Sequence, residues 1–243
     1  MSPTSPLTHE LQTLKSLTNY PAWIFEELRP FLGTQLAEIG GGLGAFSAVI
    51  AREYVLRRPD ASLDVFEPDA ALFDALGEFL HEQFHPLMQA GRLQTIQGEF
   101  RSPPQRYDTA ILVNVLEHIE DDGRLLDSIY ESLAPHGTLI VYVPALPWLF
   151  SPLDHAVGHF RRYDKRQLHR LFESHHFEVV KAIYMDMAGI LPWYLFNVLG
   201  RSHAINARLA QFYDRWFVPA TKFVERRCGA PLGKNLLIIG QKP

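Results

Sequence analysis

The sequence contains little cysteine and no strong excess of either charge. Cys228 is the only cysteine among 243 residues, so the chain cannot form an internal disulfide or a cysteine-based metal cluster, which fits a reducing compartment. With 23 basic and 27 acidic residues, the chain lacks the basic face that nucleic-acid binding normally requires. The start, MSPTSPLTHELQ, has neither a basic segment nor an apolar core. We expect no nucleic-acid partner, no signal peptide and a cytoplasmic protein.

Long apolar runs are also missing. The stretch near 190–199 is apolar, but it is too short to cross a bilayer and Pro192 interrupts it. Hydrophobic residues make up 47% of the chain, which is enough to bury the core of one α/β domain. We therefore expect a single domain over 1–243, in which the first ten or so polar residues are disordered.

Segments with the apolar spacing of a strand alternate along the chain with segments that have the apolar spacing of a helix. Short β-like runs occupy 35–39, 62–66, 92–97, 109–113, 138–143, 177–184 and 235–240. Segments in which apolar residues recur at helical spacing lie between most of these runs. One example is Leu72, Leu76 and Leu80, after the expected N-cap Asp69. Alternation of this kind predicts an α/β fold with a mostly parallel sheet covered by helices on both faces. In such sheets ligands bind at the carboxyl ends of the strands.

The first β-like run leads into a glycine-rich turn, in LAEIGGGLGAF. Gly40, Gly42 and Ala45 fit the dinucleotide fingerprint G-x-G-x-x-G/A, which indicates a nicotinamide or flavin nucleotide. Glu38 argues against a pyrophosphate, because a carboxylate at the mouth of the same turn repels it. S-adenosylmethionine, with a sulfonium, an ammonium and no phosphate, is the better electrostatic match. Glu67, in LDVFEPDA, is expected to accept the two ribose hydroxyls, a feature that both nucleotides share.

Later stretches identify a family. EIGGGLG, VFEPD, YDTAILVNVLEHIEDD and LAPHGTLIVYVPA resemble successive motifs of the class I S-adenosylmethionine-dependent methyltransferases, and the resemblance extends from NYPAW to LLIIGQK. The pattern VPA…LD…GH.RRY after the fifth strand resembles one branch of that family. The resemblance implies a Rossmann-like methyltransferase fold, a three-layer sandwich around a seven-stranded, mostly parallel sheet. The last strand, in KNLLIIGQK, would be antiparallel, and the cofactor would be S-adenosyl-L-methionine.

The resemblance also implies the cofactor contacts. They are Tyr20, Trp23, Glu38, Gly40, Gly42, Gly44, Glu67, Pro68, Glu99, Phe100, Asn114, Val115 and Leu116. The glycines would line the methionyl portion, and Asn114 would offer backbone to it. Glu99 and Phe100 would flank the adenine, although the family more often has aspartate at the first of these positions. Tyr20 and Trp23 would fold over the cofactor from an N-terminal segment of about 11–33, or would simply pack that segment onto the sheet.

The chemistry beyond cofactor binding is expected from the loop PALPWLFSPLDHAVGHFRRYDKRQL. Methyl transfer requires an acceptor about 3 Å from the methyl group and, for a hydroxyl or amine, removal of a proton. Asp154 and His159 offer a carboxylate and an imidazole for this task, with His155 as an alternative and Tyr163 as a further candidate base. A structural role for His159 in the loop stays open. We expect no metal, because Gly158 disfavours a helical turn between His155 and His159 and no third nitrogen or sulfur ligand is suggested nearby.

Two neighbouring pairs allow simpler interpretations. Arg161 and Arg162 either bind a carboxylate or phosphate of the acceptor or pair with acids of the domain. Glu117 and His118, in NVLEHI, are expected to cap the next helix and to fill its contact with the fourth strand.

An insertion of about 186–234 between the sixth and last strands is rich in aromatic residues. From 201 to 227 it carries six basic residues against two acidic ones. It is a lid whose aromatics wall an apolar acceptor pocket, an amphipathic element, over 190–227, that rests on the inner face of an anionic membrane, or simply a helical cap that packs on the sheet. We predict a methyltransferase that acts on a small or lipid-like acceptor at oxygen. The alternatives are a nucleotide-dependent oxidoreductase on the same fold and a non-catalytic cofactor-binding protein.

Overall fold

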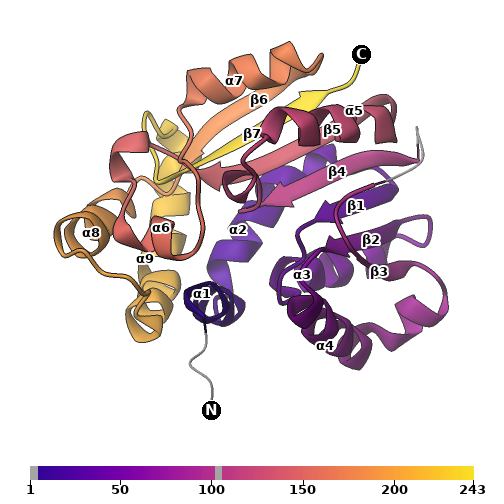
Figure 1. Ribbon diagram of the computed structural model, residues 1–243, viewed down its shortest axis with the longest axis horizontal. Helices are drawn as coiled ribbons and strands as arrows, with labels where there is room; N and C mark the ends of the chain where they lie inside the picture. Colours follow the sequence, from indigo (N-terminus) through magenta and orange to yellow (C-terminus); the bar gives the residue numbers. More distant parts are fainter. Residues whose placement is uncertain (1–4, 102–105) are drawn as a thin grey trace.

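The computed structural model describes residues 5–101 and 106–243 (Figure 1). The helices are α1 Pro6–Lys15, α2 Asn19–Leu28, α3 Ala45–Glu53, α4 Ala70–Gln89, α5 Asp122–Ser132, α6 Pro152–Ala156, α7 Lys165–Ser174, α8 Ile190–Trp193 and α9 Ala207–Cys228. The strands are β1 Gln35–Ile39, β2 Ser62–Glu67, β3 Leu93–Gln97, β4 Tyr107–Val113, β5 Leu133–Pro144, β6 Glu178–Met185 and β7 Asn235–Gln241. Short 3₁₀ turns lie at η1 Arg29–Phe31, η2 Val55–Arg57, η3 Leu116–His118 and η4 Pro147–Leu149, with a π-helical turn at η5 Tyr194–Leu199.

The strands form one seven-stranded sheet in the order β3-β2-β1-β4-β5-β7-β6. Neighbours pair in parallel except on both sides of β7, which runs antiparallel to β5 and β6. The predicted fold class is therefore confirmed, including the antiparallel last strand. Because β1 and β4 are neighbours although the chain between them forms β2 and β3, the carboxyl ends of β1 and β4 mark the point where ligands bind in such sheets.

Apolar side chains cover both faces of the sheet. Along β5, Ile140 and Tyr142 join the core beneath α2, α3 and α4, whereas Val141 and Val143 join the core beneath α5 and α7. This alternation follows from the two-residue period of a strand, which turns successive side chains to opposite faces. Figure 1 shows the resulting three layers, with α5 and α7 on one side of the sheet and α3 and α4 on the other.

The N-terminal region is more ordered than predicted. The expectation of a disordered start of about ten residues is wrong from Pro6 onward, because α1 begins there with Pro6 in its first turn and the Ser5 hydroxyl accepting from the backbone N–H of Thr8 at 3.1 Å. Residues 1–4 lie outside the described residues. The start of α2 is fixed from the far end of the chain, since the Asp214 carboxylate on α9 accepts from the backbone N–H of Tyr20 at 2.7 Å.

The insertion folds into α8, η5 and α9. Val218 and Tyr213 pack this part of the chain onto the core beside α2. In the described part of the chain, no helix has both the length and the apolar character needed to cross a bilayer.

Candidate active site

A glycine turn follows β1 at the carboxyl edge of the sheet. Gly40, Gly42 and Gly44 have φ angles of 78°, 55° and 78°, a left-handed region that glycine enters without steric cost. At Gly40 space is limiting as well, because a Cβ atom would lie 2.5 Å from Val115 Cγ2. The Gly40 N–H donates to the Phe66 carbonyl at 2.8 Å, which ties the turn to β2. The turn thus presents bare backbone at the start of α3.

Glu38 lies beside this turn as a buried carboxylate. Its side chain is 3% exposed, and its Oε2 atom finds no hydrogen-bond partner among the described residues. Burial, reinforced by the negative charge of Glu67, raises the pKa of Glu38 to about 8. A buried acceptor without a partner fits a cationic ligand group such as the ammonium of S-adenosylmethionine, and it disfavours a pyrophosphate.

Glu67 closes β2 and contacts the same turn. Its Oε2 accepts from the Gly42 N–H at 2.7 Å and its Oε1 from the Asp69 N–H at 3.0 Å. Each carboxylate oxygen has a second lone pair, so both remain able to accept from a ribose hydroxyl. Burial raises the pKa of Glu67, although the two backbone donors oppose that shift. Pro68 is exposed and leads the chain into α4.

A cavity of about 100 Å³ lies between the glycine turn and the N-terminal helices. Glu38, Asn114 and Tyr20 line it, together with Leu11 and Leu14 of α1. Cavities that hold small ligands usually measure about 300–1,000 Å³. The α1 leucines therefore fill part of the space that a whole nucleotide would need.

The other predicted cofactor residues differ in position. Trp23 is 2% exposed and packs in the core, edge-on to Tyr20 with ring centres 6.3 Å apart, so it does not line the cavity. Phe100 is also buried, with its ring centre 4.9 Å from that of Phe66. Glu99 is exposed, and its carboxylate lies 3.4 Å from the guanidinium of Arg101. Neither Glu99 nor Phe100 lines the cavity.

The chain beyond β4 continues from the cavity wall into η3. Asn114 adopts a left-handed φ of 54° and donates its N–H to the Tyr142 carbonyl at 2.8 Å. Val115 packs against Gly40, and Leu116 is fully buried. These three residues therefore connect the cofactor cavity with the polar residues that follow in η3.

Asp154 organises the loop after β5. Its Oδ2 accepts from the backbone N–H and the hydroxyl of Ser151 at 2.8 and 2.7 Å, in a capping box at the start of α6. Its Oδ1 lies 2.9 Å from both His159 Nδ1 and Arg162 Nε. Burial alone would raise the pKa of Asp154, but the bond to His159 and the charge of Arg162 outweigh it and hold the pKa low. Asp154 therefore stays ionised.

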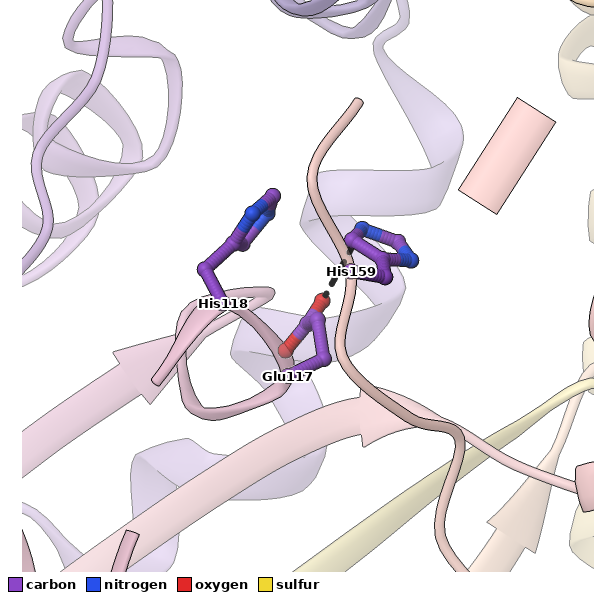
Figure 2. A group of neighbouring side chains, drawn as sticks. All are labelled: Glu117, His118 and His159. Carbon is purple, nitrogen blue, oxygen red and sulfur yellow. Dashed lines mark ion pairs between the residues drawn. The ribbon is translucent and has the colours of Figure 1, made fainter. Parts of the chain in front are cut away.

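Figure 2 shows that His159 faces Glu117 and His118. His159 Nε2 lies 3.9 Å from Glu117 Oε1, and the rings of His159 and His118 lie edge-to-face with centres 4.5 Å apart. Glu117 is completely buried, and neither of its carboxylate oxygens has a hydrogen-bond partner in the described part of the chain. A carboxylate and two imidazoles thus converge between η3 and the loop after α6, three to four residues along the chain from Asn114, which lines the cavity.

Burial shifts the pKa values of these groups in different directions. It raises the pKa of Glu117 to about 7, against the opposing charge of His159, and it lowers the pKa of His118 to about 4. Burial would also lower the pKa of His159, but the bond to Asp154 and the charge of Glu117 leave it raised. Glu10, on α1, lies within electrostatic range of His159, and burial raises its pKa. Shifts of this kind cluster where proton transfer or ligand binding takes place.

The remaining loop candidates point elsewhere. His155 is exposed on α6. The Tyr163 hydroxyl donates to the Leu116 carbonyl at 3.2 Å and to Asp122 Oδ2 at 2.9 Å, so it ties the loop to η3 and α5. Arg161 pairs with Asp122 at 2.8 Å, and the buried Arg162 holds Asp154. Both arginines therefore form ion pairs with acids of the domain, as in the second of the two interpretations that the sequence allowed.

Sequence reasoning did not assign Glu117 and His118 to the site. They were expected to cap and pack the next helix, yet the Asp121 side chain caps α5 instead. The reason for expecting no metal also fails, because Glu117 and His118 supply further ligand atoms beside His159. The available signal was their position directly after β4, at the edge where parallel sheets bind ligands.

The chain matches a known protein family. Residues 14–182, more than half of the chain, match the family described as "Methyltransferase domain". The chain belongs to this family. It is a family of S-adenosylmethionine-dependent methyltransferases, so the predicted family, enzyme class and cofactor are confirmed, and the oxidoreductase alternative is not supported.

Individual relatives are distant. The Schizosaccharomyces pombe ubiquinone biosynthesis O-methyltransferase is 28% identical over 120 residues, which cover 49% of this chain and 40% of that protein. The chain spans 5% to 40% of the length of the curated relatives that it matches. The fold is similar to phosphoethanolamine N-methyltransferase 2 from Haemonchus contortus, solved with S-adenosyl-L-methionine (TM-score 0.61, 15% identity, 93% of this chain and 52% of that one). It is also similar to geranyl diphosphate C-methyltransferase from Streptomyces coelicolor (TM-score 0.61, 12% identity, 91% and 77%).

Proposed function

We propose that this chain transfers a methyl group from S-adenosylmethionine to an oxygen of a small or lipid-like acceptor. The observation that carries the proposal is the buried group of Glu117 and His159 directly beyond Asn114, which lines the cofactor cavity. An oxygen acceptor must lose its proton, and a buried acid–base pair next to the methyl donor supports that chemistry. The cofactor supplies a methyl group on a sulfonium, and the protein supplies binding, alignment and a proton acceptor.

The cofactor site combines the glycine turn with two acids. In this proposal Glu38 accepts from the ammonium, Glu67 accepts from the ribose hydroxyls, and Asn114 offers backbone to the methionyl group. The segment of about 11–33 covers this site, with Tyr20 on the cavity wall. Since the cavity measures about 100 Å³, Leu11 and Leu14 must move outward when a cofactor enters. The helix α1 then acts as a cover that opens and closes.

His159 is the proposed proton acceptor, and Asp154 is its positioning residue. The ionised Asp154 accepts from Nδ1–H of His159, which fixes the tautomer of the neutral ring, and in that neutral form Nε2, on the side of Glu117, can accept a proton. Arg162, bonded to the same Asp154 oxygen, keeps the carboxylate in place. Tyr163 is a support of the loop in this proposal, and His155 takes no part.

The acceptor class follows from the insertion of about 186–234. Its inner aromatics pack on the domain: Trp193 donates its indole N–H to the Leu149 carbonyl at 3.1 Å, and the Tyr213 hydroxyl donates to Asp186. Its outer side chains form an exposed apolar surface, here called the α8–α9 surface. They are Leu191, Leu195, Phe196, Leu199, Leu209, Phe212, Trp216, Phe217 and Phe223, each at least 47% exposed.

The α8–α9 surface fits an anionic membrane. Arg201, Arg208, Arg215 and Arg227 are exposed around it, and none of them forms an ion pair within the described residues, whereas Lys222 pairs with Glu26. Aromatic residues flanked by unpaired arginines favour the interface between lipid headgroups and acyl chains. We therefore propose peripheral membrane contact through 190–227. The names of two relatives, which refer to ubiquinone biosynthesis and to geranyl diphosphate, support a lipid-like acceptor.

The catalytic proposal is tested with purified protein, labelled S-adenosylmethionine and a cellular lipid extract, with the products identified by mass spectrometry as features shifted by one methyl. His159→Ala should lower turnover by roughly a hundredfold or more, the size of a general-base contribution, with S-adenosylhomocysteine affinity nearly unchanged. The matched control His155→Ala, which alters an exposed imidazole on the same loop, should have little effect. A His159→Ala protein that loses cofactor affinity in step with turnover would show that the histidine only supports the loop.

The membrane proposal is tested by co-sedimentation with vesicles. Binding to anionic vesicles should be strong at low salt and should fall as salt rises, because salt screens the arginines. Trp216→Ser should weaken it, whereas Trp148→Ser, which alters another exposed tryptophan outside the insertion, should not. Equal and negligible binding to neutral and anionic vesicles would leave the insertion without a membrane role.

A further inference from the structure

Glu117, His118 and His159 bring three potential metal ligands into one place. One ligand atom from each lies within 4.8 Å of the other two. Ligand atoms around one zinc-like ion lie about 3–4 Å apart, because each is about 2.0–2.2 Å from the metal. Small side-chain rotations therefore suffice to close the group around one ion. The three residues come from two separate segments, η3 and the loop after α6, which is how Figure 2 shows them.

Asp154 gives this group the supporting contact that metal-bound histidines usually have. A histidine that binds a metal through one ring nitrogen commonly donates its other N–H to a carboxylate, which fixes the ring. His159 Nδ1 lies 2.9 Å from Asp154 Oδ1, and this leaves Nε2 directed toward Glu117. The Asp154 carboxylate is itself held by Ser151 and Arg162, so the orientation of His159 is prepared in advance.

The charges around the group also match a cation. Arg162 pairs with Asp154 and offsets its charge. Glu117 has no cationic partner among the described residues other than the His159 ring at 3.9 Å, and both of its oxygens are buried without a donor. Glu10 adds another carboxylate within electrostatic range. A buried carboxylate in this state is costly unless it is paired or coordinates a metal.

We propose that Glu117, His118 and His159 bind one divalent transition-metal ion. Two imidazoles and one carboxylate suit zinc, manganese, iron or cobalt, and three protein ligands leave coordination positions open. The chain thereby holds a metal next to the methyl donor, where an acceptor oxygen can complete the coordination. That last role rests on the proposed function, whereas binding of the metal does not.

With a metal bound, the proton path changes. His159 Nε2 would be a ligand instead of the base, and a metal ion would lower the pKa of a bound acceptor hydroxyl so that it could release its proton to solvent water. The same His159→Ala variant would then fail through loss of the metal. Metal dependence of turnover therefore distinguishes a histidine base from a metal-supported acceptor.

The test uses the full chain, stripped with a chelator and titrated with Mn²⁺, Co²⁺ or Zn²⁺. Calorimetry should give about one ion per chain, Co²⁺ should produce visible absorption bands, and the melting temperature should rise with metal concentration. Glu117→Gln and His118→Ala should each weaken binding at least about tenfold. The matched control is His169→Ala, which removes a surface imidazole that lies 3.2 Å from the Glu173 carboxylate on α7 and should bind as the parent does.

Failure of the metal site and failure of the proposed function give different results. Metal binding that is absent in the parent, or equal in Glu117→Gln and the parent, would overturn the site; retained S-adenosylhomocysteine binding by Glu117→Gln would confirm that this variant is folded. If the site fails while chelator-resistant methyl transfer continues, the proposed function stands without the metal. If the metal binds and no acceptor is ever methylated, the site stands and the proposed function fails.

Discussion

Asp214 and Glu117 are both buried carboxylates, yet their surroundings differ. Asp214 accepts from the backbone N–H groups of Thr18, Asn19 and Tyr20 at 3.0, 3.1 and 2.7 Å, so it joins α9 to the start of α2. Glu117 is equally buried but has no hydrogen-bond donor among the described residues. One carboxylate is a completed structural contact, and the other is left open toward the cofactor side of the molecule.

Asp186 and Glu38 are a second pair of buried carboxylates, of which only the first has all its contacts within the protein. Asp186 accepts from the Gly189 N–H at 3.1 Å and pairs with Lys234 at 3.1 Å, whereas Glu38 has an oxygen without a partner in the described part of the chain. Folded proteins satisfy nearly all buried polar groups, so an open one needs an explanation. Glu38 lies at the end of β1 and Glu117 follows β4, two neighbouring strands that end at the ligand-binding edge, which explains both as ligand contacts.

The largest expected effect comes from removing a completed carboxylate. Asp214→Ala leaves three backbone N–H groups without their acceptor, and we expect it to lower the free energy of unfolding by roughly 2–4 kcal/mol. For a chain of this size that corresponds to a fall of roughly 5–15 °C in melting temperature, measured by calorimetry. The control Asp74→Ala, on the exposed face of α4, should change the melting temperature very little.

Glu117→Gln tests whether the Glu117 carboxylate contributes to the stability of the fold. It removes a buried charge that no donor stabilises, so the melting temperature measured without metal should stay the same or rise. A loss of stability as large as that of Asp214→Ala would show that Glu117 is a structural contact. The distinction between carboxylates with and without hydrogen-bond donors would then be wrong.

Glu38 should give the stability of the protein a distinct pH dependence. Its pKa is raised to about 8 from the usual 4.5, so in that window the unfolded chain has released a proton that the folded protein keeps. Stability contributed by Glu38 is therefore present below about pH 4.5 and is lost as the pH rises through 8. Glu38→Gln should remove this decline in the free energy of unfolding across that window.

Cofactor binding supplies the second readout for Glu38. An ammonium next to the carboxylate favours its ionised form, so binding of S-adenosylhomocysteine should release a proton in the parent and none in Glu38→Gln. Calorimetry in buffers with different ionisation enthalpies measures that proton. Identical proton release in the two proteins would mean that Glu38 does not contact the ligand.

The sequence predicted the glycine turn and the two acids that lie beside it because the signals for these features are local. Glu38 precedes the glycine turn by two positions, and Glu67 ends the next strand, so each was assigned from a contiguous motif. The acceptor half depends on contacts between distant segments. His159 meets Glu117 only because β4 and the loop after β5 end at the same edge of the sheet, and no local motif encodes that contact.

The N-terminal helix was missed for a different reason. Ser5 and Pro6 are good residues for a helix start, and Leu7, Leu11 and Leu14 lie at helical spacing, so the signal was present. The short polar beginning was instead interpreted as disorder. Trp23 was assigned to the cofactor because the resemblance gave its position in the chain but not the direction of its side chain, which points into the core.

Tyr163 gives the smallest expected effect and tests whether the acceptor loop contains a second base. Its hydroxyl donates to Asp122 and to the Leu116 carbonyl, and burial together with the charge of Asp122 raises its pKa, so it keeps its proton at neutral pH and cannot accept another. Tyr163→Phe removes these bonds but leaves Asp122 paired with Arg161 at 2.8 Å. We expect a loss of about 1 kcal/mol in the free energy of unfolding, a melting temperature lower by roughly 2–4 °C, and turnover reduced only a few-fold as the loop loosens over η3. A fall in turnover of about a hundredfold at unchanged stability would instead identify Tyr163 as the base and return His159 to a structural role in the loop.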